Sequence, residues 1–314
     1  MSVGTFVEDL ARHAVFVLYY CCSLTTSTFI LFYASFLGHA HPFNKRVRSV
    51  LSAVTCAPWL LCAGVRLAIQ NETLLAARGE IRRTINVGTH ASHIDGLSMM
   101  VLYWRNRYVI GPPCAVVKRE VLLTPFYGPF AYLVGNIFVA RGSTKEAAVK
   151  SMRTVGQRIK DGYMIGAFPE GTRRRSPSCG RDHLLPFKKG TFHMVKNLFD
   201  EGVDITISPF CLVGSRTAWP RGRLLPLPRS KVLIKFCEHV NISKEDTPES
   251  LLARTRERIE NGIDEAAKID GKYDIENAFE KGVEVDLFRE FSLEAILLVL
   301  PPLVTVYLAC VGLL

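Results

Sequence analysis

Between residues 81 and 269 the chain alternates short, apolar, β-branched runs with longer runs whose apolar residues recur at helical spacing. The short runs are typical of buried strands, and the long runs are typical of amphipathic helices. Strands that alternate with helices favour parallel pairing, so the pattern predicts an α/β fold with a mainly parallel central sheet flanked by helices. The predicted strands are residues 83–88, 115–118, 137–140, 163–168, 205–212 and 232–236, and the predicted helices are residues 96–105, 145–160, 189–199 and 249–268.

The two ends of the chain are more apolar than this middle part. Residues 14–38 carry no charge, and the run is long enough to cross a bilayer core of about 30 Å. Residues 49–65 are also uncharged, but Pro58 interrupts them; they suit a re-entrant or interfacial helix and are marginal for a full span. Residues 295–314 predict a terminal span or a kinked hairpin. We therefore expect an N-terminal membrane anchor (residues 1–70), a central α/β domain over residues 71–270, and a linker with a C-terminal membrane segment (residues 271–314).

The charge of the chain bears on its partners. A net charge of +10 suits nucleic acid, anionic lipid or a phosphorylated substrate. The basic residues are scattered, and no zinc-finger, homeodomain or RNA-binding signature appears, so we expect lipid head groups and no nucleic acid. The nine cysteines include no C-x-x-C pair and are expected to be reduced, structural thiols.

His90 and Asp95 stand where the strand at residues 83–88 meets the following helix. In a regular helix, positions five apart lie roughly 140° apart, so these side chains could not meet. They can meet only if His90 lies on the turn before the helix and Asp95 reaches back from its first turn. The carboxylate then holds one ring nitrogen, and the other can take a proton from a substrate hydroxyl. The pair thus predicts a positioned general base, while helix capping by His90 and dipole compensation by Asp95 remain open alternatives.

Two other catalytic centres could use the same stretch. A serine hydrolase requires Gly-x-Ser-x-Gly at a strand-to-helix elbow, and the chain contains none. A metal centre could use His90, His93 and Asp95, but the later histidines are isolated and form no second cluster of ligands. We therefore expect no metal, and we expect His93 to be structural or to line the site.

A second stretch with chemical potential follows the strand at residues 163–168. It continues with Glu170, Gly171, Thr172 and Arg173. The glycine permits close backbone approach, the threonine offers a hydroxyl, and the planar guanidinium suits phosphate oxygens. Glu170 is expected to orient an arginine or a substrate hydroxyl. A charged surface turn is the alternative for the arginine run that begins at Arg173.

Two more cations follow predicted strands. Arg141 comes directly after the strand at residues 137–140, and Lys118 ends the strand at residues 115–118. Ligands of parallel sheets gather at the carboxyl ends of strands, so these cations are expected at the same edge as His90 and Glu170. A buried ion pair is the alternative for Arg141. Pro209 is expected to break the strand at residues 205–212, where it shapes an acyl pocket or marks a sheet edge.

Taken in order, these stretches resemble the glycerophospholipid acyltransferase family, and within it the lysophosphatidate (1-acylglycerol-3-phosphate) acyltransferases. That family is known by an Asn-His-x-Ser-x-x-Asp block, a Gly-x-Ile-Phe-x-x-Arg block, a Phe-Pro-Glu-Gly-Thr-Arg block and a later strand with proline. Here they stand at residues 89–95, 135–141, 168–173 and 205–209, and the resemblance covers roughly residues 75–240. Thr89 replaces the family asparagine, which puts the rate and the choice of acceptor in question.

The resemblance implies a membrane-bound O-acyltransferase that needs no cofactor. It implies that His90, oriented by Asp95, activates the sn-2 hydroxyl of a lysophospholipid acceptor, lysophosphatidate, which attacks acyl-CoA to give phosphatidate. Glu170, Gly171, Thr172 and Arg173, helped by Arg141 and Lys118, are implied to hold the acceptor's glycerol phosphate.

The resemblance and the basic residues beside the membrane segments together predict where the enzyme works. We expect an integral protein of the endoplasmic reticulum or a bacterial inner membrane, with its active site facing the cytosol. The alternatives are another acceptor, such as glycerol 3-phosphate or another lysophospholipid, and an inactive lipid-binding membrane protein.

Overall fold

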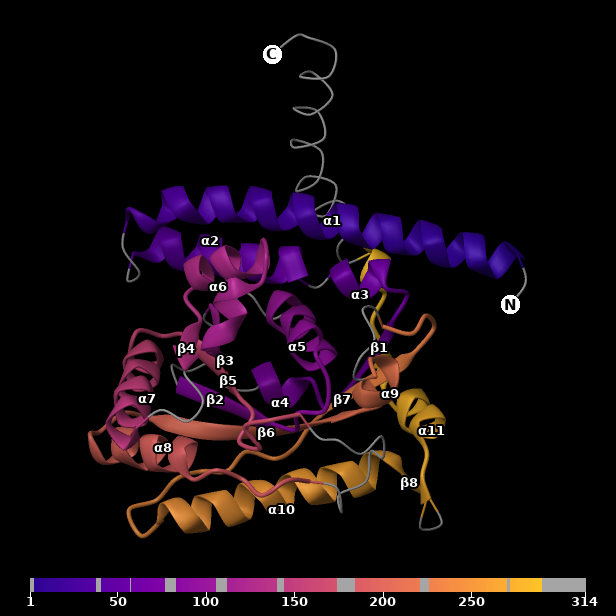
Figure 1. Ribbon diagram of the computed structural model, residues 1–314. Helices are drawn as coiled ribbons and strands as arrows, with labels where there is room; N and C mark the ends of the chain where they lie inside the picture. Colours follow the sequence, from indigo (N-terminus) through magenta and orange to yellow (C-terminus); the bar gives the residue numbers. More distant parts are fainter. Residues whose placement is uncertain are drawn as a thin grey trace.

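Figure 1 shows the computed structural model of the chain, in which an α/β domain lies beneath a long N-terminal helix. The structure describes residues 3–37, 41–56, 58–76, 83–105, 112–139, 144–173, 184–220, 226–269 and 272–289. The predicted C-terminal membrane segment, residues 295–314, lies outside these ranges.

The centre of the domain is an eight-stranded sheet in the order β10-β1-β7-β6-β2-β5-β3-β4. Five of its seven neighbouring pairs are parallel, and only β6–β7 and β1–β10 are antiparallel. The predicted mainly parallel sheet is therefore confirmed. Its strands are β1 (Arg66–Gln70), β2 (Arg83–Gly88), β3 (Pro113–Lys118), β4 (Ile137–Val139), β5 (Met164–Ala167), β6 (Ile205–Val213), β7 (Lys231–Phe236) and β10 (Val283–Glu284); β8 (Lys268–Ile269) and β9 (Lys272–Tyr273) form a separate pair.

Helices cover both faces of the sheet, as predicted (Figure 1). Helices α5 (Ile94–Arg105) and α6 (Tyr127–Val134) share one apolar core with the N-terminal helices. Helices α7 (Lys145–Lys160), α8 (Gly190–Asp200) and α10 (Pro248–Ala267) share the core of the opposite face. The shorter elements are α4 (Thr73–Ala76), η1 (Arg119–Leu123), α9 (Ser215–Ala218) and α11 (Ile275–Glu280).

The N-terminal helices form the outermost layer. Helix α1 (Val3–Ser35) packs against α2 (Pro42–Cys56), α3 (Pro58–Cys62) and α6 and lies across the top of the molecule in Figure 1. Its stretch from His13 to Ser35 is long and apolar enough to cross a membrane, the only such helix among the described residues. The predicted second apolar segment is divided between α2 and α3, and neither helix has the length of a span.

Strand β6 departs from its predicted form. Pro209 was expected to break the strand or mark an edge, yet β6 runs unbroken from Ile205 to Val213 between β2 and β7. Every residue of the strand is buried. The carbonyl oxygen of Pro209 accepts a hydrogen bond from the backbone nitrogen of Cys237 at 2.9 Å, so the ladder continues past the proline.

The register of the sheet sets where the chemistry gathers. Strands β2 and β5 are parallel neighbours, with Val87 opposite Ala167, so the residues after both strands emerge side by side. His90 and Glu170 follow these two strands. The expectation that they share the carboxyl edge of the sheet is met.

Candidate active site

The His90 side chain lies on the turn between β2 and α5, as its spacing from Asp95 requires. Its Nδ1 atom is 2.9 Å from Oδ2 of Asp95, and the histidine is 25% exposed while the aspartate is fully buried. An ionised carboxylate can only accept, so Nδ1 donates the hydrogen bond. In the neutral imidazole, the other ring nitrogen, Nε2, then carries a lone pair that can accept a proton.

Asp95 also holds the backbone of the turn. Its Oδ2 atom accepts hydrogen bonds from the backbone nitrogens of Ala91 at 2.7 Å and Ser92 at 2.8 Å. The carboxylate lies in the first turn of α5, where the helix dipole favours negative charge. The same oxygen thus organises both the turn and the His90 ring before any substrate is present.

Glu170 fixes the backbone of His90 from the neighbouring strand. Its Oε1 atom accepts a hydrogen bond from the His90 backbone nitrogen at 2.9 Å, and Oε2 accepts one from the Leu185 nitrogen at 3.1 Å. The side chain is only 3% exposed. Glu170 was expected to orient an arginine or a substrate hydroxyl. Its carboxylate also holds the backbone at His90, a contact that was not predicted.

A stack of rings supports the His90 side chain. The Phe168 ring lies almost parallel to His90, with ring centres 4.4 Å apart, and meets Phe210 of β6 edge-on at 6.2 Å. A Cβ atom at Gly88 would lie 2.2 Å from the Phe210 ring. Glycine is therefore required at the end of β2 so that Phe210 can reach the stack.

Two hydroxyl groups connect the turn to β6 and the segment after it. The Thr89 hydroxyl accepts a hydrogen bond from the Leu212 nitrogen at 2.9 Å. The Ser92 hydroxyl donates one to the carbonyl oxygen of Trp219 at 3.0 Å. Thr89, which departs from the family pattern, is thus fully buried and bonded to the sheet.

The turn after Glu170 is more open. Gly171 has a φ of +66°, and a Cβ atom there would lie 2.8 Å from Nζ of Lys188. The Lys188 side chain therefore lies directly over the Gly171 backbone. Lys188 and Thr172 are exposed, while Arg173 is half-buried. This places an ammonium group on a turn where phosphate oxygens could approach the backbone.

His93 lies near the cations of the site. Partial burial, followed by the charges of Arg173, His90 and Lys118, lowers the pKa of His93 to about 4 despite an opposing effect of Asp95. Its ring packs beside Trp219, with ring centres 5.5 Å apart. His93 is therefore neutral at physiological pH and lies within the electrostatic reach of Lys118 and Arg173.

The predicted site residues are thus largely brought together. His90, Asp95 and Glu170 are joined by hydrogen bonds, Gly171 to Arg173 follow directly, and Lys118 acts on His93. Arg141 lies outside the described residues. Among those described, no three His, Cys, Asp or Glu side chains are grouped as ligands of one metal ion.

Sequence reasoning missed three residues of this site. Phe168 stacks on His90, Trp219 packs beside His93, and Lys188 covers Gly171. Lys188 directly precedes the predicted helix at residues 189–199, and α8 begins at Gly190. No local pattern indicates any of the three contacts, because each joins segments distant in the chain.

The geometry suits acid–base chemistry beside a turn that could bind an anion. An oriented imidazole with a free nitrogen can take a proton from a hydroxyl, and the adjacent exposed cations can bind an anion. In the described residues, no nucleophilic side chain is hydrogen-bonded to the ring.

Comparisons with known proteins show what the chain is similar to. Residues 67–213, from β1 to the end of β6, match the family model described as Acyltransferase. The 1-acyl-sn-glycerol-3-phosphate acyltransferase of Haemophilus influenzae is 35% identical over 116 residues, covering 36% of this chain and 43% of that protein. The enzyme of that name from Salmonella typhimurium is 30% identical over 163 residues, covering 51% of this chain and 61% of that protein. The chain thus spans about half the length of these two relatives.

A solved structure shares the fold. The crystal structure of the 1-acyl-sn-glycerophosphate acyltransferase from Thermotoga maritima superposes with a TM-score of 0.59 and 18% identity. The similarity covers 82% of this chain and 96% of that one. At this identity the likeness concerns the fold alone.

Proposed function

We propose that the chain, whose residues 67–213 match the Acyltransferase family model, transfers a fatty acyl group from acyl-CoA to the sn-2 hydroxyl of lysophosphatidate. The product is phosphatidate. The observation that carries the proposal is the hydrogen bond between His90 Nδ1 and Asp95 Oδ2, together with the contact of Glu170 to the His90 backbone. These contacts leave Nε2 as a positioned base.

The reaction begins at the acceptor hydroxyl. Nε2 of His90 takes its proton while the oxygen attacks the thioester carbonyl carbon, and the carbonyl π electrons move to oxygen. The imidazolium that forms is stabilised by the Asp95 carboxylate. No covalent acyl-enzyme is formed in this mechanism.

The tetrahedral intermediate then collapses. The carbonyl re-forms, the carbon–sulfur bond breaks, and the CoA thiolate receives the proton that His90 carries. The products are the new ester and CoA with a free thiol, and His90 returns to its starting state. One residue therefore serves first as base and then as acid.

The acceptor phosphate is held by the open turn beside the base. Arg173 and Lys188 supply positive charge, Thr172 supplies a hydroxyl, and Lys118 and Arg141 assist. Glu170 holds the His90 backbone in this scheme. The names of the relatives support a phosphorylated glycerol acceptor.

The membrane is the source of the acceptor. Helix α1 exposes large apolar side chains, among them Phe29, Phe32 and Tyr33, and Phe36 is exposed in the turn that follows it. Such a face suits the apolar interior of a bilayer. An acceptor that lives in the membrane would meet the protein at this layer.

An acceptor panel tests the proposal. Purified full-length protein in lipid nanodiscs receives one labelled acyl-CoA and, in turn, lysophosphatidate, glycerol 3-phosphate and lysophosphatidylcholine. We expect the highest kcat/KM with lysophosphatidate. A higher value with glycerol 3-phosphate or lysophosphatidylcholine would reassign the acceptor, and no turnover with any of the three would indicate an inactive lipid-binding protein.

A further inference from the structure

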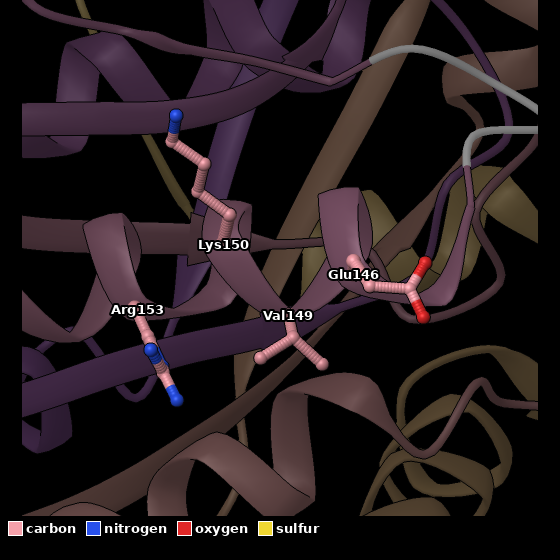
Figure 2. Close-up of a pocket in the computed structure, with 4 residues that line it drawn as sticks. All are labelled: Glu146, Val149, Lys150 and Arg153. Carbon is pink, nitrogen blue, oxygen red and sulfur yellow. The ribbon is translucent and has the colours of Figure 1, made fainter.

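Helix α7 carries a groove on the face turned away from the sheet. Its described lining is Glu146, Val149, Lys150 and Arg153, and its volume is about 620 Å³ (Figure 2). These positions recur at intervals of three and four and form one stripe of the helix. The groove runs roughly 10 Å along α7, given the helical rise per residue.

The groove presents unpaired positive charge. Among the described residues, no carboxylate forms an ion pair with Lys150 or Arg153, and both side chains are exposed. Figure 2 shows Glu146 directed away from Lys150. Val149 is 43% exposed and offers an apolar contact, and Figure 2 shows the Lys150 and Arg153 side chains extending in opposite directions from the helix. Two cations beside an apolar patch suit a ligand with phosphate groups and a planar, partly apolar ring system.

The groove also lies close to the edge of the sheet where His90 emerges. Helix α7 follows β4, which pairs in parallel with β3, and Lys118 at the end of β3 stands opposite Val139. The amino-terminal end of α7 is therefore at the carboxyl edge of the sheet. Thr144 caps this end by accepting a hydrogen bond from the Ala147 nitrogen.

The two faces of the sheet differ in what they can bind. The exposed apolar side chains of α1 lie on the α5 face, which suits a membrane. Helix α7 shares the core of the opposite face with α8 and α10. A water-soluble polyphosphate can approach α7 without crossing the apolar layer.

We propose that the α7 groove, formed by Glu146, Val149, Lys150 and Arg153, binds the nucleotide part of the acyl-CoA donor. Lys150 and Arg153 contact its phosphate groups, and Val149 contacts the base. The two substrates then reach the site from opposite faces of the sheet, the lipid from the α1 layer and the donor from α7. This inference rests on the proposed acyl transfer.

A direct binding experiment tests the groove. Full-length protein in nanodiscs of zwitterionic lipid is titrated calorimetrically with CoA, which requires no turnover. We expect the Kd for CoA to rise at least about tenfold in Lys150→Ala/Arg153→Ala, because charged contacts to phosphate are lost. The matched control, Lys244→Ala/Lys281→Ala, removes two exposed lysines from other parts of the surface and should leave the Kd unchanged.

Kinetics with two donors complete the test. In Lys150→Ala/Arg153→Ala, the KM for acyl-CoA should rise, while the KM for acyl-pantetheine, which lacks the nucleotide, and for lysophosphatidate should stay unchanged. Unchanged CoA affinity overturns the inference, and so does weaker binding to anionic vesicles with CoA affinity retained, which would indicate a lipid head-group site. If the wild-type protein binds CoA through Lys150 and Arg153 yet transfers nothing to lysophosphatidate, the proposed acceptor is wrong, while the proposal that the groove binds CoA is retained.

Discussion

The turn that carries His90 and the turn that carries Gly171 lie side by side at the sheet edge, yet they are built differently. In the first, Asp95 is fully buried and bonds to the His90 ring and to two backbone nitrogens. In the second, Gly171 has a positive φ, and Thr172 and Lys188 are exposed. A base must be oriented before the substrate arrives, whereas cations that bind a substrate must remain accessible. These opposite requirements explain why the His90 turn is buried and hydrogen-bonded while the Gly171 turn is open.

The buried turn should show the largest effect on the chemical step. Asp95→Asn keeps the size of the side chain but removes the charge that stabilises the His90 imidazolium and fixes its tautomer. We expect kcat to fall by about 10³- to 10⁴-fold, with little change in the KM for lysophosphatidate.

The matched control for Asp95 is Asp274→Asn. Asp274 also accepts two backbone hydrogen bonds at a helix start, from Glu276 and Asn277, but at α11. The kcat of the Asp274→Asn variant should stay at the wild-type value. A retained kcat in Asp95→Asn would show that the buried carboxylate does not serve the base.

Glu170→Gln should have the next largest effect. The amide nitrogen of glutamine would face a backbone N–H, either of His90 or of Leu185, so one hydrogen bond is lost. At about 1–3 kcal/mol, this predicts a fall in kcat of roughly ten- to hundredfold. Glu72→Gln, at an ion pair with Arg105, is the control for the loss of charge alone and should not change kcat.

The open turn should respond in substrate binding instead. Lys188→Ala should raise the KM for lysophosphatidate by about tenfold, because one charged contact to phosphate is lost, while kcat stays near wild type. The neighbouring Lys189 pairs with Glu249 on another side, so Lys189→Ala is a close control. If Lys188→Ala lowered kcat alone, the distinction between the two turns would be lost.

The smallest expected effect concerns His93. Its pKa of about 4 in the folded protein is below the ordinary value of 6.5, so the unfolded chain binds more protons between these values. Stability should therefore decrease as pH falls from about 6.5 toward 4, and His93→Gln should remove that part of the decrease. Since the ring keeps solvent contact, the difference should be less than about 1 kcal/mol in denaturant unfolding. An identical pH dependence of the free energy of unfolding in the wild-type and His93→Gln proteins would contradict the lowered pKa of His93.

Features set by local spacing could be predicted from the sequence. The alternation of strands and helices predicted the sheet, and the five-residue interval predicted that His90 stands before the helix. Both depend on the fixed geometry of helices and strands. The shared edge of His90 and Glu170 followed from parallel pairing.

Contacts set by register or by long loops could not be predicted. The bond from Glu170 to the His90 backbone depends on Val87 standing opposite Ala167, which is a property of the assembled sheet. Lys188 reaches Gly171 across a long connection between β5 and α8. The expected break at Pro209 was wrong because the strand is held by neighbours on both sides.

The packing of α1 also could not be predicted from the sequence. An apolar run of this length is equally compatible with a spanning helix and with one that packs on a domain. Here one side of α1 is buried against α2, α3 and α6, while the other exposes large apolar side chains. Composition alone does not distinguish these arrangements.

The most direct test is the rate of acyl transfer by His90→Ala. Purified wild-type and His90→Ala proteins, matched in thermal unfolding, receive labelled acyl-CoA and lysophosphatidate at saturating concentrations. If Nε2 of His90 is the base, kcat should fall by about 10²- to 10⁴-fold, while CoA binding is retained. A fall in kcat of less than about threefold would contradict the role of His90 as the base.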